Sequence, residues 1–334
     1  MQNIINGLPI AAVILLLAVG FAFLVKGADF FVEGSSSIAK KLKVPPIIIG
    51  LTIVAMGTSL PETAVSVTAS LVQNNELAVS NVVGSNIFNL MFVIGVCSIL
   101  TPIMVQKATV VRDIPLSLGC ALFLLVLGIS GLGDKTGMTL GHADGVIFLI
   151  VFAGYIFTMV RSAMKARAAG QKVEIEGVEE CDNMKELSYG KSILFLIVGA
   201  AAIAFGGDLT VDTASRIAIE LGMSQTLVGL TIVSIGTSLP ELVTSVVAAR
   251  KNEVDMAVGN AVGSNIFNIL MVLGISSAIS PVALIWENII DIVLLMVFSV
   301  MVWIFAGTRK KIERKEGIIM VVVYLIYCAY IIAR

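Results

Sequence analysis

Residues 50–95 read GLTIVAMGTSLPETAVSVTASLVQNNELAVSNVVGSNIFNLMFVIG, and residues 229–274 read GLTIVSIGTSLPELVTSVVAARKNEVDMAVGNAVGSNIFNILMVLG. The two segments align without a gap at an offset of 179, and 26 of their 46 positions are identical. A shared apolar composition would not produce that many identities, so the chain contains an internal repeat. The same offset brings Asp29 onto Asp208, so the repeat extends beyond the two segments.

The composition around this repeat is that of a membrane protein. Of 334 residues, 57% are hydrophobic and 13% are charged, which is about half of the roughly 25% charged share usual in soluble domains. Lys and Arg number 22 against 23 Asp and Glu, and the net charge of -1 provides no basic surface for nucleic acid. The composition therefore excludes a soluble globular protein and a nucleic-acid partner, and it predicts that the chain lies in a lipid bilayer.

Ten apolar segments are long enough to cross the bilayer, because a spanning helix needs about 20 mostly apolar residues. They lie at about 8–36, 45–72, 78–100, 113–131, 142–163, 190–215, 224–249, 256–279, 287–306 and 317–333. We therefore expect an all-α membrane protein with ten transmembrane helices in two sets of five. The first five-helix repeat is 1–163, the second is 190–334, and the polar connector 164–189 is a linker between them.

Basic residues in the connectors predict the orientation. Alternate connectors hold 18 of the 22 Lys and Arg residues, and the positive-inside rule places those connectors in the cytoplasm. Both termini should then be extracytoplasmic, with the 164–189 linker inside and the 132–141 connector outside. Because no organelle-targeting signal is recognised, we expect a multi-pass protein of the plasma membrane.

The two halves should be inverted relative to each other. Five crossings separate equivalent positions, so the second copy enters the membrane from the opposite face, as in many secondary transporters. An inverted repeat of this kind favours a transporter that exposes a central site to each side of the membrane in turn.

The motif Gly-Thr-Ser-Leu-Pro-Glu lies near the middle of the second expected helix, at 57–62, and recurs in the seventh, at 236–241. Proline lacks an N–H group and clashes with the carbonyl four residues back. Both helices should therefore be kinked or broken, which would free carbonyls at Ala55 to Thr58 and at Ser234 to Thr237. Side-chain oxygens on the same stretches come from Thr58, Ser59 and Glu62, and from Thr237, Ser238 and Glu241.

A second repeated motif, Gly-Ser-Asn-Ile-Phe-Asn, occupies 84–89 in the third helix and 263–268 in the eighth. Residues four apart share a helix face, so Ser85 should lie beside Asn89, and Ser264 beside Asn268. The glycine of each motif permits close approach of a neighbouring helix. Together the motifs offer carboxylates, amides, hydroxyls and carbonyls without His or Cys. Such a set suits Ca²⁺ or Na⁺ and argues against zinc or copper.

Glu62 and Glu241 favour a functional site over simple packing. An acid at the centre of the bilayer costs at least ~2.5 kcal/mol, yet both glutamates occur at repeat-equivalent positions. The chain lacks a G-x-x-x-x-G-K-[ST] loop, so ATP should not drive the process. A membrane-embedded hydrolase could use two carboxylates as acid and base. The neighbouring ligand-like oxygens and the inverted repeat argue against it, and we do not expect an enzyme.

With these motif pairs in both halves, the sequence resembles the sodium/calcium exchangers of the cation/calcium exchanger superfamily, in their short prokaryotic form. The resemblance covers the whole ten-helix plan, and the motif pairs look like the two alpha repeats of that family. It implies that Glu62 and Glu241 bind Ca²⁺ with help from the carbonyls of Thr58 and Thr237. For Na⁺ it implies flanking sites formed by the Ala55 and Ser234 carbonyls and by Thr58, Thr237, Ser85 and Ser264, and a central site at Asn89 and Asn268.

The resemblance also implies that the long helices 1 and 6 slide past the other eight to switch access. One departure is Asn268, because some family members carry Asp at that place in the second repeat. The large regulatory loop of animal members is missing, so calcium regulation from that source is not expected.

The charge of the site predicts exchange. Without an ion, two ionised glutamates would cross the closed state unpaired, which is expensive in a low dielectric. One Ca²⁺, or two or three Na⁺, relieves that charge, so loaded forms should switch and the empty form should not. We expect a Na⁺/Ca²⁺ antiporter that needs no cofactor and no protein partner.

Two alternatives to this antiporter use the same scaffold. In a proton/calcium exchanger, glutamate protons would replace Na⁺, although the hydroxyls beside each glutamate favour Na⁺. A passive channel would show flux with no requirement for an ion on the other side.

Overall fold

The structure is a computed structural model of the chain, and it describes residues 7–72, 75–130, 138–168, 187–223 and 234–333 together with Ile5, Val228 and Ile232. In these residues, eight helices are long and apolar enough to span a membrane, or nine when one bent pair is counted as a span. The expected all-α membrane protein is confirmed.

In chain order the elements are α2 (Ile10–Leu42), α3 (Pro46–Ile49), η1 (Gly50–Val54), α4 (Ala55–Thr58), α5 (Leu60–Leu71), α6 (Asn75–Ile87), η2 (Phe88–Val93), α7 (Ile94–Leu100), β1 (Ile103–Met104), η3 (Thr109–Asp113), α8 (Ile114–Ser130), β2 (Thr139–Leu140), α9 (His142–Ala168), α10 (Tyr189–Glu220), α12 (Ser234–Gly236), α13 (Leu239–Arg250), α14 (Val254–Phe267), η5 (Asn268–Val272), α15 (Leu273–Ile279), β3 (Val282–Ala283), α16 (Trp286–Arg309), β4 (Lys311–Ile312) and α17 (Arg314–Ala333).

Two helices are interrupted at the repeated proline motif. The helical stretch that ends with α4 is bent by 49° relative to α5, and Pro61 lies in the first turn of α5. In the second half, α12 ends at Gly236 and α13 begins at Leu239, with Pro240 in its first turn. Both interruptions fall where the sequence predicts a kink. The start of the expected seventh helix, 224–233, lies outside the described residues except for Val228 and Ile232.

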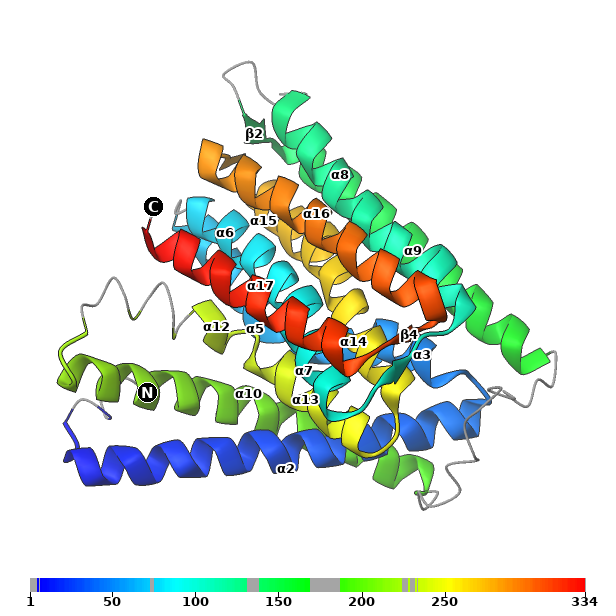
Figure 1. The fold of residues 1–334 in the computed structure, drawn as a ribbon, viewed down its shortest axis with the longest axis horizontal. Helices are drawn as coiled ribbons and strands as arrows, with labels where there is room; N and C mark the ends of the chain where they lie inside the picture. Colours follow the sequence, from blue (N-terminus) through cyan, green and yellow to red (C-terminus); the bar gives the residue numbers. More distant parts are fainter. Residues whose placement is uncertain are drawn as a thin grey trace.

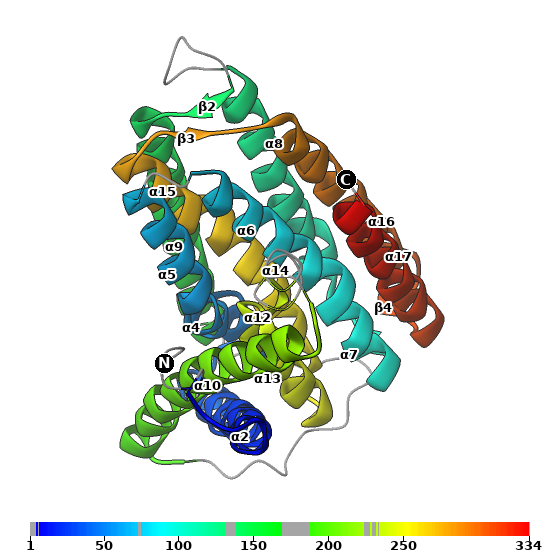
Figure 2. The same ribbon diagram turned by 90° about the vertical axis from the view of Figure 1, so that its left-hand side faces the viewer.

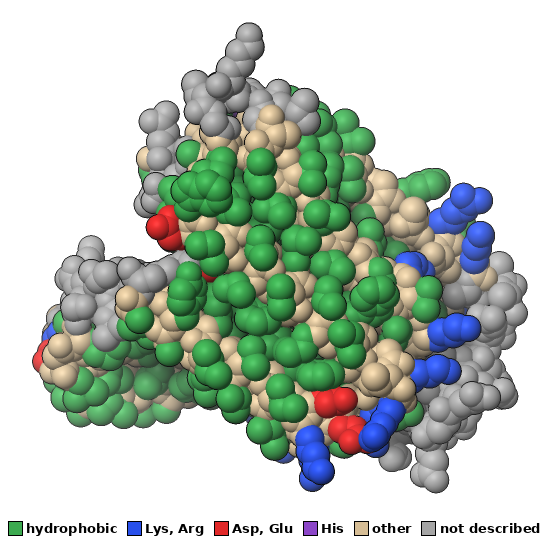
Figure 3. Space-filling view, turned by 45° about the horizontal axis from the view of Figure 1, so that its top comes forward, with side chains coloured by type: hydrophobic (Ala, Val, Ile, Leu, Met, Phe, Trp, Pro, Cys, Tyr) green, Lys and Arg blue, Asp and Glu red, His purple; other side chains and the backbone are tan. Residues whose placement is uncertain are grey.

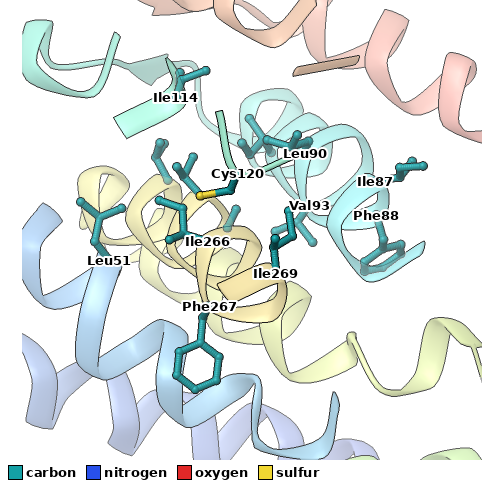
Figure 4. Packing of buried hydrophobic residues seen from close by; sticks show 14 of the residues in the cluster. Leu51, Ile87, Phe88, Leu90, Val93, Ile114, Cys120, Ile266, Phe267 and Ile269 are labelled. Atoms are coloured by element: carbon teal, nitrogen blue, oxygen red, sulfur yellow. The ribbon is translucent and has the colours of Figure 1, made fainter. Parts of the chain in front are cut away.

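Two long helices form the centre of the molecule: α6 with η2 and α7, and α14 with η5 and α15. In each of them, 78% of the most apolar window is buried. A π-helical turn interrupts both, beginning at Phe88 in one and at Asn268 in the other. Their apolar side chains belong to one cluster of buried residues, which also includes Leu51 of η1 and Ile114 of α8 (Figure 4).

Helices α2 and α10 lie side by side and cross one end of the other helices (Figures 1 and 2). Only 22% and 33% of their most apolar windows are buried. Glycines line the contact between them: a Cβ at Gly27 would lie 3.0 Å from the Gly199 carbonyl oxygen, and one at Gly206 would lie 2.8 Å from that of Gly20. Gly20 of α2 contacts Gly206 of α10, and Gly27, further along α2, contacts Gly199, which comes earlier in α10. The two helices are therefore antiparallel.

The loop between α13 and α14 contacts α2. Lys251 Nζ lies 3.3 Å from Asp29 Oδ1 and donates to the Asp29 carbonyl at 3.1 Å. Glu253 of the same loop is buried, and burial raises its pKa, while the charge of Lys40 on α2 lowers it. Because Val72 occupies the position equivalent to Lys251 in the first half, the sequence provides this ion pair in one half only.

Two short antiparallel strand pairs join the connectors of the two halves. Ile103 of β1 lies opposite Ile312 of β4, and Leu140 of β2 lies opposite Val282 of β3. Each half therefore contributes one strand to each pair.

The outer surface is largely apolar. Hydrophobic side chains cover most of the face shown in Figure 3, and the Lys and Arg side chains gather along its edges. Large apolar residues such as Leu15, Ile150 and Phe157 are about two-thirds exposed, at 66%, 65% and 66%. This distribution is expected where lipid, rather than water, surrounds the helices.

Candidate cation-binding site

Glu62 and Glu241 are fully buried, and each lies in the first turn of the helix that follows a break. Ser238 donates a hydrogen bond to Glu62 Oε1 at 3.0 Å, and Ser59 donates to Glu241 Oε1 at 2.9 Å. Each glutamate is therefore held by the serine that precedes the proline in the other half. This crossover brings the two copies of the proline motif together.

The central helices supply further hydroxyls and amides to the same site. Ser85 donates to Glu62 Oε1 at 3.3 Å, and Ser264 donates to Glu241 Oε1 at 3.5 Å. Asn268 Nδ2 lies 3.3 Å from Ser85 Oγ, so an amide of the second half reaches a hydroxyl of the first. The structure thus brings together the serines, glutamates and Asn268 that the sequence predicted.

Buried oxygens of this site that have no hydrogen-bond partner within the described residues are Oε2 of Glu62, Oε2 of Glu241 and Oδ1 of Asn268. Both polar atoms of the buried Asn89, one oxygen and one nitrogen, also have no partner there. Buried polar groups are usually satisfied, and the two carboxylates also interact electrostatically as like charges. Unsatisfied oxygens beside two acids suit a cation, and a set without nitrogen or sulfur ligands suits a hard one.

The acidic residues of the site are the two glutamates alone. Among the described residues, no group of three or more His, Cys, Asp and Glu side chains lies close enough to hold a metal ion, and the site itself contains two, Glu62 and Glu241. The formal charge available to a cation at the helix breaks is therefore that of the two glutamates.

Two asparagines that the sequence analysis did not select also contact the site. Thr58 Oγ1 lies 3.0 Å from Asn260 Oδ1, and Thr237 Oγ1 lies 3.3 Å from Asn81 Oδ1. The signal that could have identified them is the repeat itself, because its offset aligns Asn81 with Asn260. Each also lies one turn before the site serine of its helix, on the same face.

The backbone carbonyls at the break are only partly released. The Ala55 carbonyl, which the sequence predicts to be free, still accepts a hydrogen bond from Ser59 N at 3.0 Å. A carbonyl oxygen has two lone pairs, so one remains for a cation. Ser234 lies in α12, and the role assigned to its carbonyl stays a prediction.

An all-helical membrane fold with a buried, oxygen-lined site at two helix breaks defines a transporter of cations. A family model described as sodium/calcium exchanger protein matches residues 12–161 and 191–333. The chain belongs to this family.

Its relatives match over four-fifths or more of the chain. The sodium/calcium exchanger MaX1 of Methanosarcina acetivorans is 33% identical over 337 residues, covering 94% of this chain and 96% of the relative. The inner membrane protein YrbG of Escherichia coli is 36% identical over 269 residues, covering 80% and 79%. A solved structure of the sodium-calcium exchanger NCX_Mj superimposes with a TM-score of 0.80 at 32% identity, covering 96% of this chain and 99% of that one. The chain is therefore a cation/Ca²⁺ antiporter of this family and not an enzyme.

Proposed function

We propose that the protein exchanges Na⁺ for Ca²⁺ across the plasma membrane by alternating access. The observation that carries the proposal is the pair of buried glutamates. In each, Oε1 is held by hydroxyls and Oε2 has no partner within the described residues. Fixed hydroxyls and unsatisfied carboxylate oxygens form a site prepared for a hard cation.

The ligands are assigned as the family resemblance implies. Ca²⁺ binds to Glu62 and Glu241 with the carbonyls of Thr58 and Thr237. Na⁺ binds at flanking and central sites formed by the carbonyls of Ala55 and Ser234 and by Thr58, Thr237, Ser85, Ser264, Asn89 and Asn268. Ser59 and Ser238 of the proline motifs add two further side-chain oxygens to the proposed site. The crossed hydrogen bonds between the halves support a single composite site.

Coupling follows from the charge of this site. Two buried carboxylates without a counter-charge are costly in a low-dielectric interior, so the empty protein resists the change of access. Ca²⁺ neutralises the two carboxylates during the change of access in one direction, and Na⁺ does so in the other direction. Exchange therefore results without ATP, a cofactor or a partner protein.

The architecture proposed for this mechanism has ten transmembrane helices in two inverted five-helix repeats, 1–163 and 190–334, joined by the linker 164–189. The antiparallel α2 and α10 and the reciprocal strand pairs support inversion. Both termini are extracytoplasmic in this proposal. The relative YrbG is named as an inner membrane protein, which supports a cell-membrane location.

A thiol-labelling experiment tests the orientation. A membrane-impermeant reagent applied to intact cells should miss the native Cys181 and should label Lys135→Cys, two positions outside the described residues. The opposite pattern would overturn the proposed topology.

Transport by purified protein in proteoliposomes tests the function. Uptake of labelled Ca²⁺ should require Na⁺ on the opposite side. Uptake driven equally well by a proton gradient without Na⁺ would identify a proton/calcium exchanger instead, and uptake without any trans cation would identify a passive channel.

A further inference from the structure

The amide of Asn260 has its orientation fixed by a backbone carbonyl, an acceptor that cannot donate. Asn260 Nδ2 lies 3.3 Å from the carbonyl oxygen of Glu241 and 2.9 Å from Ser245 Oγ. A carbonyl oxygen only accepts hydrogen bonds, so the NH₂ group must face Glu241. Asn260 Oδ1 then faces the opposite way, toward Thr58.

This orientation determines where the Thr58 hydroxyl hydrogen points. Thr58 Oγ1 lies 3.0 Å from Asn260 Oδ1, closer than it lies to either of the two backbone carbonyls beside it. Since an amide oxygen only accepts, the single Thr58 hydrogen is assigned to Asn260. The other acceptors near Thr58 Oγ1 are the carbonyls of Val54 and Ala55, at 3.2 and 3.4 Å, and the Glu241 carboxylate. With the hydrogen committed to Asn260, these oxygens and the lone pairs of Thr58 are left available to a cation.

The first half repeats the arrangement. Asn81 Nδ2 lies 3.4 Å from the Glu62 carbonyl and 3.0 Å from Ser66 Oγ, so Asn81 Oδ1 faces Thr237 and accepts its hydrogen at 3.3 Å. Both asparagines are at least nine-tenths buried, and each joins the glutamate backbone of its own half to the threonine of the other.

We propose that Asn260 and Asn81 are positioning residues that turn the hydroxyl hydrogens of Thr58 and Thr237 away from the transported cation. The inference rests on the proposed function, since it concerns ligands of the same site. A cation is repelled by a hydroxyl hydrogen pointing at it and bound by the oxygen lone pairs. Loss of the asparagine therefore weakens cation binding through the threonine.

A double-mutant cycle distinguishes this role from simple packing. Na⁺-driven Ca²⁺ flux is measured in proteoliposomes for Asn260→Leu, Thr58→Val and the double variant, and Na⁺ competition against labelled Ca²⁺ is measured in detergent. Asn260→Leu should raise the half-saturating Na⁺ concentration about five- to tenfold, the factor expected for one lost hydrogen bond. The same change made in Thr58→Val should have no further effect, because no hydroxyl remains to be turned.

The other half provides a matched control. In the Thr237→Val background, Asn260→Leu should still raise the half-saturating Na⁺ concentration by the full factor. Asn81→Leu should no longer raise it there, because its threonine partner is gone. Asn288→Leu removes a buried amide that donates to Ser80 at 3.1 Å on another helix, and it should leave half-saturation unchanged.

The outcomes separate the two proposals. If Asn260→Leu acts equally in the Thr58→Val and Thr237→Val backgrounds, the asparagine is merely structural and the inference is wrong. If Asn260→Leu is not monodisperse, the Asn81 series decides in the same way. Absence of Na⁺-driven flux in the wild-type protein would instead contradict the proposed function.

Discussion

The central helices and the α2–α10 pair differ in what holds them in place. The central helices are buried over 78% of their most apolar windows, and directional hydrogen bonds cross between the halves there, such as that from Asn86 Nδ2 to the Asn265 carbonyl at 3.1 Å. The α2–α10 pair is buried over 22% and 33%. Its contact is formed largely by glycine backbones and by ring pairs such as Phe23 with Phe205, whose centroids are 5.2 Å apart, together with a buried hydrogen bond from Ser192 Oγ to Ser37 Oγ at 2.9 Å.

The difference predicts that the two regions resist movement unequally. Hydrogen bonds weaken steeply when their geometry is distorted, so the helices that carry the site must keep their relative positions. The glycine contact lies between α2 and α10 themselves, so the two helices should move as one unit. Because little of the pair is buried, we expect it to shift against the other helices at lower energy. This contrast supports the proposed sliding of helices 1 and 6.

The largest effect is expected from substitution of the two site glutamates. Glu62→Gln or Glu241→Gln removes half of the site charge while keeping the shape, so Ca²⁺ exchange should be abolished and the fold retained. Proteoliposome flux and size-exclusion chromatography measure the two properties. The exposed Glu287, in the first turn of α16, provides the control variant Glu287→Gln, which should exchange normally. Near wild-type exchange by either site variant would show that the assignment is wrong.

A smaller effect is expected in the α2–α10 contact. A Cβ at Gly206 would lie 2.7 Å from Leu24 N, so Gly206→Ala must push the two helices apart. Overpacking of this kind costs about 1–3 kcal/mol, and the melting temperature in detergent should fall. The matched variant is Gly154→Ala, because no described atom lies within 4 Å of a Cβ at that position. Equal stability of the two variants would contradict a tight glycine contact.

A modest effect is expected where α2 meets the α13–α14 loop. The Lys251–Asp29 pair spans 3.3 Å between side chains that are 26% and 33% exposed, so it is worth at most about 1 kcal/mol. Because sliding of α2 would break the pair, Lys251→Met should raise turnover up to about fivefold at low ionic strength, and the gain should fade in high salt. Lys26→Met is the control, since Lys26 is 76% exposed and 3.9 Å from Asp29. A gain that is unaffected by salt would rule out the ion pair as its cause.

The smallest effect is expected for K⁺. Asn268 is neutral and its Nδ2 donates to Asn86 Oδ1 at 3.1 Å, so the formal charge at the site is that of the two glutamates. Na⁺-driven Ca²⁺ flux should therefore be unchanged when K⁺ is replaced by choline, and a collapse of flux would contradict this. Asn268→Asp should move the pH dependence of exchange upward, because the added carboxylate must lose its proton beside like charges.

Much of this protein was predictable because the decisive patterns are local. Apolar runs of spanning length, a proline in mid-helix and the spacing of Ser85 and Asn89 by one turn depend only on neighbours in the chain. They predicted the described spans, the break before α5 and the oxygen-rich character of the site. The repeat offset showed that both halves carry the same groups, although the ten-helix count and the inversion remain proposals.

The sequence by itself determined which groups the protein has and at what spacing, whereas the tertiary structure decided which groups meet. Nothing in the chain near Ser59 indicates that it binds Glu241 rather than Glu62, three residues away. Nor does local sequence show that Asn260 faces Thr58 across the molecule. Partners of this kind are more than 180 residues apart. Their pairing is set by how the two central helices pack against the broken ones, which depends on side-chain shape over the whole core rather than on any local period.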